Sequence, residues 1–373
     1  MRRTKLIIGV FIGLLLLAVV AVTALFLVNP AVFRNQLQAG ASAVYGRQVQ
    51  FYGPISLVRS LRPWIVVGDM TIGNPGWASG AHFATAEKLS VQVALLPLLL
   101  GDLRVLDVLL TGVDVFIEEG PEGANNYSFG NKADREEARV LLGIEQLMIR
   151  DAIINYRSAD ASTIRFEIAE ARLWNFPGQP ERIEGKGSAK GMAFTIKLTA
   201  DKAAELSGPQ NPWSAKLNIQ GPDLSLIMDG RMTNPFVWDH GDYRIAINGK
   251  QADSLETLLG VEFPMTGPFE LSSNVNVAGG SFKVTDLVAQ VRWSSDAPGI
   301  KITSGEVSGG PDDPLDIALQ VKYGNTPLGF TFKSEYLFEG ISQAKPWPME
   351  ARLSIAETIL DVQPGLHWPG LCL

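Results

Sequence analysis

From Arg47 onward, apolar residues recur at every second position in short segments. A period of two is that of a β-strand, whose successive side chains point to opposite faces of a sheet. Gly-Pro, Asn-Pro-Gly and Thr-Gly sequences separate the segments and are typical of turns. Since one face of each segment is apolar and the other more polar, the pattern predicts an antiparallel sheet with one face in water.

The segments predict a mostly β fold, with about eighteen strands against two or three helices. A short helix is expected at 252–259. After the polar stretch 118–137 the predicted strands cover 146–157, 163–174, 193–199, 215–220, 224–232, 243–249, 268–277, 282–291, 300–303, 315–323, 328–336 and 349–355. A sheet of this length cannot remain flat and open in water, so it must close, stack on a second sheet or curl around something apolar.

A loose similarity recurs along the chain, at 110–116 and 149–156 and more weakly at 67–72 and 302–307. We interpret each copy as the end of a strand, a two-residue turn and a new strand. Such repetition predicts a sheet extended by adding hairpins. The alternative is that similar turn chemistry arose independently in each copy.

The first apolar run, residues 6–28, contains no charged residue. At about 1.5 Å of rise per residue, a helix of this length crosses a bilayer core of roughly 30 Å. Arg2, Arg3 and Lys5 precede the run, which predicts a cytoplasmic N-terminus and export of the rest. The alternative is a signal peptide cleaved after Ala24. The residues taken to represent the anchor are Leu6, Phe11, Leu16, Leu25 and Val28.

A second helix is predicted directly after this run, because Asn29 caps well and Pro30 suits the first helical position. Gly46 supplies a stop. The apolar positions at helical spacing are Phe33, Leu37, Ala41 and Val44. The helix either lies on the membrane surface or, as we favour, covers the apolar interior of the following sheet.

Little in the sequence suggests catalysis, a metal or a cofactor, so we expect no enzyme. The histidines His82, His240 and His367 are scattered, and no phosphate-binding or nucleophile motif occurs. The only cysteine, Cys372, excludes a disulfide framework within the chain. Only 19% of the residues are charged and the net charge is −7, without a basic cluster after the first apolar run, so we expect no nucleic-acid partner.

An ordered set of short motifs resembles the AsmA family of envelope proteins of Gram-negative bacteria, related to TamB and the bridge-like lipid transfer proteins. After the N-terminal run and helix come the strand 49–57 with Gly53 and the Pro63–Val67 strand, followed by Met70–Pro75 and Ala86–Val93. A Gly-Ala-Asn-Asn-Tyr box at 123–127 is similar to the family's Gly-x-Asn-Trp pattern. The motifs at 258–264 and 267–271 are similar to its C-terminal region.

The resemblance implies a cytoplasmic N-terminus (1–5), a transmembrane anchor (6–28), an N-terminal AsmA-like β domain (29–130) and a continuing β-groove (131–373). The polar stretch 118–137 is the expected segment boundary. Because family members commonly run on further, we expect a chain that ends short of its relatives. The implied architecture is a long, curled antiparallel sheet forming a groove, anchored in the inner membrane and projecting into the periplasm.

The implied function is outer-membrane homeostasis, through phospholipid movement between the inner and outer membranes. The implied partners are therefore the inner membrane, phospholipids, and outer-membrane or assembly-machinery proteins. The alternative is a non-enzymatic scaffold that pairs its exposed strand edges with proteins of outer-membrane assembly.

We hypothesise that inward-facing apolar residues line a groove for acyl chains, since burying each methylene is worth about 0.8 kcal/mol. The alternative is that the same residues form the dry core of a two-sheet sandwich, because alternation is identical in both. The candidate lining residues are Val49, Phe51, Ile55, Leu57, Trp64, Val66, Leu89, Val91, Val93, Val115 and Ile117.

Overall fold

The computed structural model describes one helix and nineteen strands, so the fold is mostly β as predicted. The described residues are 34–60, 62–94, 104–120, 124–127, 144–158, 163–202, 212–233, 240–251, 267–292, 299–311, 313–334, 349–355 and 358–362. No helix within these ranges is long and apolar enough to span a membrane. The predicted anchor at 6–28, the predicted helix at 252–259 and Cys372 lie outside them.

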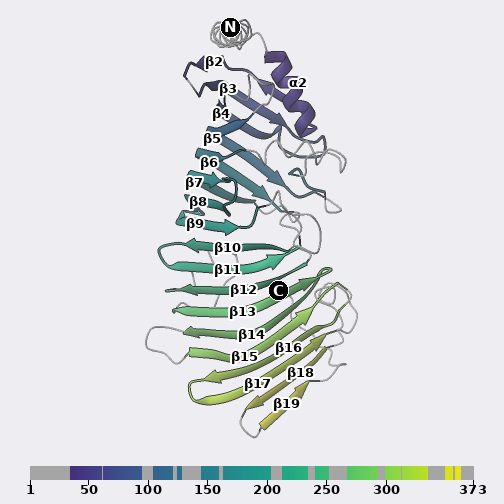
Figure 1. Ribbon diagram of the computed structural model, residues 1–373. Helices are drawn as coiled ribbons and strands as arrows, with labels where there is room; N and C mark the ends of the chain where they lie inside the picture. The colour runs from purple at the N-terminus through teal and green to yellow at the C-terminus, as the bar shows by residue number, and fades with distance from the viewer. Residues whose placement is uncertain are drawn as a thin grey trace, which may run out of the picture. The chain divides into compact units, whose positions relative to one another are not determined.

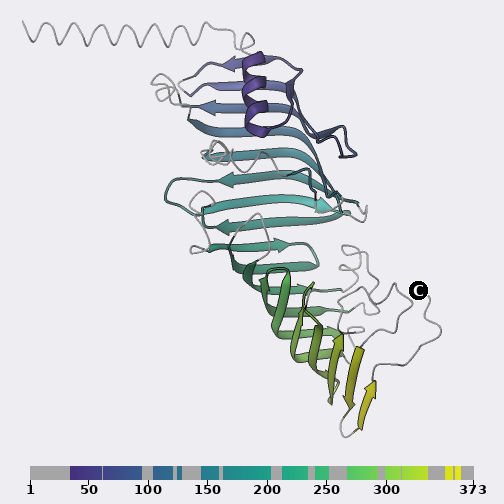
Figure 2. The same cartoon turned by 90° about the vertical axis from the view of Figure 1, so that its right-hand side faces the viewer.

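The chain divides into two units, Met1–Ala189 and Lys190–Leu373. The described elements of the first unit are the helix α2 (Arg34–Tyr45) and the strands β1 (Val49–Phe51), β2 (Ile55–Val58), β3 (Trp64–Gly73), β4 (His82–Val93), β5 (Val105–Glu118), β6 (Gln146–Arg157), β7 (Thr163–Trp174) and β8 (Glu181–Ala189). Figure 1 shows β2 to β8 following one another in order, and Figure 2 shows the strands of this unit bent along their length.

In the first unit, β1 and β2 both pair with β3, and β3, β4 and β5 follow as antiparallel neighbours. The β5–β6 pair is parallel, which corrects the expectation of an entirely antiparallel sheet. For two neighbouring strands to be parallel, the chain must return from the end of β5 to the level at which β5 began before β6 starts. The connection 119–145 is long enough for this return. β6, β7 and β8 are antiparallel again.

The second unit contains only strands, and each of β10 to β19 pairs antiparallel with the one before it. They are β9 (Met192–Ala200), β10 (Trp213–Gln220), β11 (Leu224–Met232), β12 (His240–Gly249), β13 (Phe269–Ala278), β14 (Ser281–Arg292), β15 (Gly299–Gly309), β16 (Leu315–Tyr323), β17 (Thr326–Ser334), β18 (Met349–Ile355) and β19 (Thr358–Val362). Hydrogen bonding between sequence neighbours therefore builds this sheet.

The recurring similarity noted in the sequence is not a series of turns. Each copy lies inside one continuous strand, and Asp69, Gly112 and Asp151 adopt positive φ angles of 43°, 63° and 53° at the centres of β3, β5 and β6. Gly112 and Asp151 lie at matching positions of the parallel pair, between Thr111↔Arg150 and Val113↔Ala152. The expectation of turns was wrong because Gly and Asp, which readily adopt the left-handed conformation, occur both in tight turns and at distortions within a strand.

These left-handed residues keep apolar side chains on one face across a three-residue step. Leu110 and Val113 are three positions apart, yet both pack into the cluster formed by Ala86, Val113 and Ala152. In a regular strand they would point to opposite faces. The distortion therefore shifts the inward and outward alternation of side chains by one residue, and it does so at the same level in neighbouring strands.

Helix α2 ends at Gly46, whose φ is 64°. Its Ala41 packs against the buried cluster of Val49, Phe51, Ile55 and Val67, which agrees with the favoured prediction that the helix covers the apolar interior of the sheet.

The helix also lies along the free edge of β1. Ser42 Oγ accepts from the Val49 amide at 2.9 Å, and Gln38 Oε1 accepts from the Phe51 amide at 3.2 Å. Arg34 Nη2 donates to Gly53 O at 2.8 Å. The helix side chains thus satisfy backbone groups that an edge strand would otherwise leave exposed. Figure 2 shows α2 lying across the first strands.

We predict that Gly112→Ala lowers the free energy of unfolding by about 1–2 kcal/mol, because a side chain in the left-handed region is strained. A Cβ there would also lie 2.4 Å from the Glu87 side chain, which must move. The control is Gly76→Ala, which meets nothing within 4 Å and needs no positive φ. Circular dichroism measures the thermal unfolding midpoint of both variants. Equal shifts for Gly112→Ala and Gly76→Ala would contradict a left-handed conformation at Gly112.

Candidate functional site

One face of the second unit carries a continuous apolar row across ten strands. The register places one member per strand, each opposite the next, so all share a face. From β9 to β18 the row is Ile196, Ile219, Leu226, Ile247, Leu271, Ala289, Ile302, Val321, Leu328 and Ile355. At about 4.8 Å between strands it extends roughly 40 Å.

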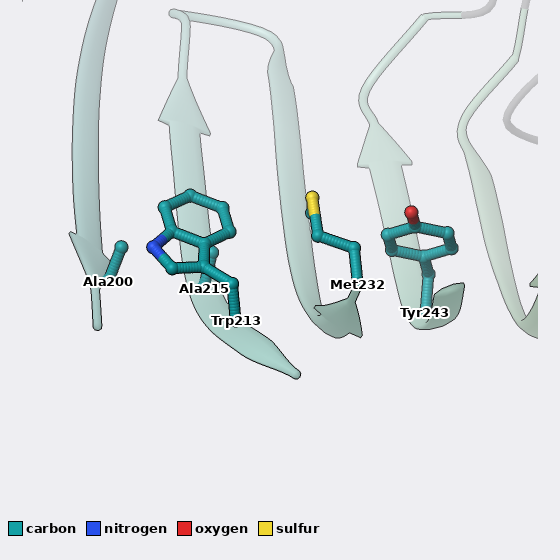
Figure 3. Packing of buried hydrophobic residues seen from close by; sticks show 5 residues of the cluster. All are labelled: Ala200, Trp213, Ala215, Met232 and Tyr243. Atoms are coloured by element: carbon teal, nitrogen blue, oxygen red, sulfur yellow. The ribbon is translucent and has the colours of Figure 1, made fainter. Parts of the chain in front are cut away.

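Large side chains on the same face contact their neighbours along the sheet. Trp213, Met232 and Tyr243 are buried and cluster with Ala200 and Ala215 from adjoining strands, as Figure 3 shows. The Trp213 Nε1 donates to Asp201 O at 2.6 Å, which satisfies its polar atom. The Tyr243 ring lies beside Gly230, where an added Cβ would come within 2.6 Å of it. Glycine therefore leaves room for the ring next to the sheet.

No second sheet covers this face within the described residues. In each unit, the substantial contacts between described elements join hydrogen-bonded neighbouring strands, apart from α2 against β1. A two-sheet sandwich would add contacts between strands that do not pair. The sandwich alternative therefore finds no support among the described elements, and most apolar-row residues are only half-buried.

The structure brings most of the candidate lining residues of the first unit onto one apolar face. Val49, Phe51 and Ile55 are buried and cluster with Val67, while the cluster also contacts Leu89. Leu57 and Val91 also lie on this face, because each is opposite Ile65, which packs against the cluster. Val115 packs against the adjoining cluster of Ala86, Val113 and Ala152. Ile117 follows Val115 by two positions, and Val93 is buried at a register irregularity.

Trp64 and Val66 lie on the other face. They pair with Gln92 and Ser90, whereas their neighbours Ile65 and Val67 pair with Val91 and Leu89. The sequence run Trp64–Val67 is apolar at every position, so alternation could not tell which pair points inward. With its amide oriented for best hydrogen bonding, Gln92 accepts from Trp64 Nε1 and donates to Asp107 Oδ2, both at 2.8 Å.

The polar faces carry paired charges. Lys333 Nζ lies 2.8 Å from Asp316 Oδ2, and Arg352 Nε lies 2.7 Å from Asp361 Oδ1. The hydrogen bond to Asp316 raises the pKa of Lys333. Such exposed pairs contribute little stability, but they keep this face wetted and distinct from the apolar one.

The described part of the box, residues 124–127, forms a buried polar corner whose role the sequence did not reveal. Asn126 is fully buried; its Nδ2 donates to Phe116 O at 2.7 Å and Asn74 Oδ1 at 3.1 Å, and its Oδ1 accepts from the Glu118 amide at 2.8 Å. Glu118 Oε2 accepts from the Ser79 amide at 2.8 Å. One carboxamide thus joins the end of β5 to the β3–β4 loop.

Within the described residues, no group of three or more His, Cys, Asp or Glu side chains is arranged to hold a metal ion. His82 and His240 are exposed at the starts of β4 and β12, and His367 lies outside the described ranges.

The model of the AsmA family matches residues 1–221, more than half of the sequence. The chain belongs to the AsmA family. No curated protein and no solved structure gives a match. Membership of the AsmA family suggests a role in envelope biogenesis or lipid transport. In this AsmA-family chain, the apolar face that no described element covers is the feature that relates the fold to such a role.

We predict that Asn126→Ala lowers the free energy of unfolding by about 2–4 kcal/mol, because it leaves the Phe116 carbonyl and the Glu118 amide without their partner. The matched control is Asn276→Ala, which removes one exposed hydrogen bond to Asp242. Chemical denaturation of both variants measures the difference, and comparable losses would rule out the proposed role of the corner.

Partial burial, and then the Glu145 carboxylate, raises the pKa of Asp107, while Arg62 opposes the shift. Because the folded state holds this proton more tightly, the contribution of Asp107 to stability falls as pH rises past its unfolded pKa. We therefore expect Asp107→Asn to stabilise the protein at pH 7, by less than about 1 kcal/mol given solvent screening, and to have no effect near pH 3. Unfolding midpoints of both proteins at pH 7 and pH 3 test this. A larger effect of the substitution at pH 3 than at pH 7 would contradict a raised pKa of Asp107.

Proposed function

We propose that this AsmA-family protein holds phospholipid acyl chains along its apolar sheet face and conducts them between the inner and outer membranes. The observation that supports the proposal most strongly is the apolar row across β9–β18, which no described element covers. Apolar surface left in water is unfavourable by about 25 cal/mol per Å², and an acyl chain would remove that cost.

The proposed energetics suit movement as well as binding. A lipid tail exchanges one apolar environment for another, so the net free-energy change of leaving the bilayer is small. The row repeats aliphatic side chains of similar size at about 4.8 Å intervals, which gives many equivalent positions. A chain of sites of similar depth lets the lipid slide, whereas one deep pocket would retain it. At roughly 40 Å, the row exceeds the bilayer core thickness of about 30 Å.

The proposal includes an inner-membrane anchor at residues 6–28, a cytoplasmic N-terminus and a periplasmic location for both units. The length and apolarity of the run and the cations before it support this topology. Anchoring would hold the first strands close to a source of lipid.

The second candidate is a scaffold in outer-membrane assembly, and the edge of β19 favours it. In the described residues β19 pairs only with β18, and Ile359 and Leu360 are 62% and 59% exposed. A strand from a partner protein could pair with this edge. Pull-down of an assembly protein, lost when Leu360→Pro removes a backbone donor, would support the scaffold over the conduit.

Neighbouring positions of β11 provide a direct test of the conduit. Leu226 belongs to the apolar row, whereas Ile227 lies on the polar face and is 37% exposed. We expect a photo-crosslinker at Leu226 to capture phospholipid in cells at least several times more often than one at Ile227. Val91 and Asp114 provide a similar pair in the first unit.

Mass spectrometry of the crosslinked products identifies what each position contacts. Equal capture of lipid at Leu226 and Ile227, or protein contacts alone at Leu226, would overturn the acyl-chain assignment.

A further inference from the structure

A hollow of about 500 Å³ lies at the ends of β10–β14, and we call it the rim hollow. Its lining combines the two faces of the sheet. Leu224 and Phe269 come from the apolar face, where they flank Gly249 in register, and Asn248 and Glu270 come from the polar face. The rim hollow is therefore a place where a molecule with an apolar part and a polar part can contact both.

Its charged groups are balanced, with two cations and two carboxylates. Lys250 Nζ donates to Asp223 Oδ1 at 3.0 Å and to Pro222 O at 3.1 Å. Glu270 and Arg292 complete the set. Among the described residues, no carboxylate lies within ion-pair distance of Arg292, so its guanidinium has donors available for a ligand.

The backbone fixes the position of Arg292 at this rim. Its amide donates to Pro268 O at 3.2 Å, and its carbonyl accepts from the Gly267 amide at 3.1 Å. The aliphatic stem passes over Gly299, where an added Cβ would lie 3.0 Å from Arg292 Cγ. The planar guanidinium at the end of this stem matches the geometry of a phosphate better than a lysine ammonium does.

We infer that the rim hollow binds the headgroup of a zwitterionic phospholipid, with its phosphodiester at Arg292 and Lys250 and its primary ammonium at Glu270 and Asp223. This inference rests on the proposed function, since the acyl chains of that lipid would lie on the apolar face that begins at Leu224 and Phe269. Ligand sites of a few hundred Å³ with a few convergent polar groups are typical of specific binding.

The test compares phosphatidylethanolamine and phosphatidylglycerol of identical acyl chains, each with a fluorescent tail, titrated onto the full-length protein in detergent. The wild-type protein should prefer phosphatidylethanolamine about 3–10-fold. Glu270→Gln should reduce this preference at least twofold, because the ammonium loses one of its two carboxylates. Arg292→Gln should weaken the binding affinity for both lipids about 3–10-fold, because both carry the phosphodiester.

Matched controls are Glu306→Gln and Lys322→Gln, exposed charges on β15 and β16 that should change neither affinity. Glycerophosphoethanolamine, which has the headgroup without tails, should compete only at much higher concentration. Competition at the concentration of the lipid would make this a site for a soluble phosphoester and overturn the lipid assignment.

Two further outcomes separate this inference from the proposed function. If both lipids bind but Glu270→Gln and Arg292→Gln behave like the controls, the rim hollow is not a headgroup site while the apolar face still holds lipid. If neither lipid binds the wild-type protein, the proposed function fails and the inference fails with it.

Discussion

Backbone hydrogen bonding between neighbouring strands is the interaction on which the β-structure of each unit depends. Within each unit the described strands gain almost no packing from a second layer, so register alone decides which side chains share a face. The mid-strand left-handed residues Asp69, Gly112 and Asp151 matter for this reason, because they reset the alternation at a common level. Without them, half of each long strand would turn its apolar residues to the polar face.

Much of this architecture could be predicted from alternation, because one-sided burial imposes a period of two on every strand. The predicted limits of β6, β7, β11, β16 and β18 agree with the structure. β8 was missed because its sequence, rich in glycine and charge, has few apolar residues to alternate. The parallel β5–β6 pair was missed because alternation carries no information on strand direction, which depends on the path of the long connection.

Side-chain roles were harder to predict than strands. Alternation assigned Val49, Phe51 and Ile55 to one face, but it failed in the unbroken apolar run that contains Trp64 and Val66. Asn126 appeared only as part of a motif, since nothing in a sequence shows that an amide is fully buried and satisfied. The rim hollow joins residues from five strands, so only the register could bring Lys250 and Arg292 together.

The proposal depends on the apolar faces being occupied by lipid and not by the protein's own side chains. Native mass spectrometry of the full-length protein, released from membrane without added lipid, tests this most directly. The account predicts mass increments of whole phospholipids that are lost when Leu226 and Ile247, adjacent members of the apolar row, are replaced by aspartate. A folded wild-type protein released with no bound lipid would contradict it.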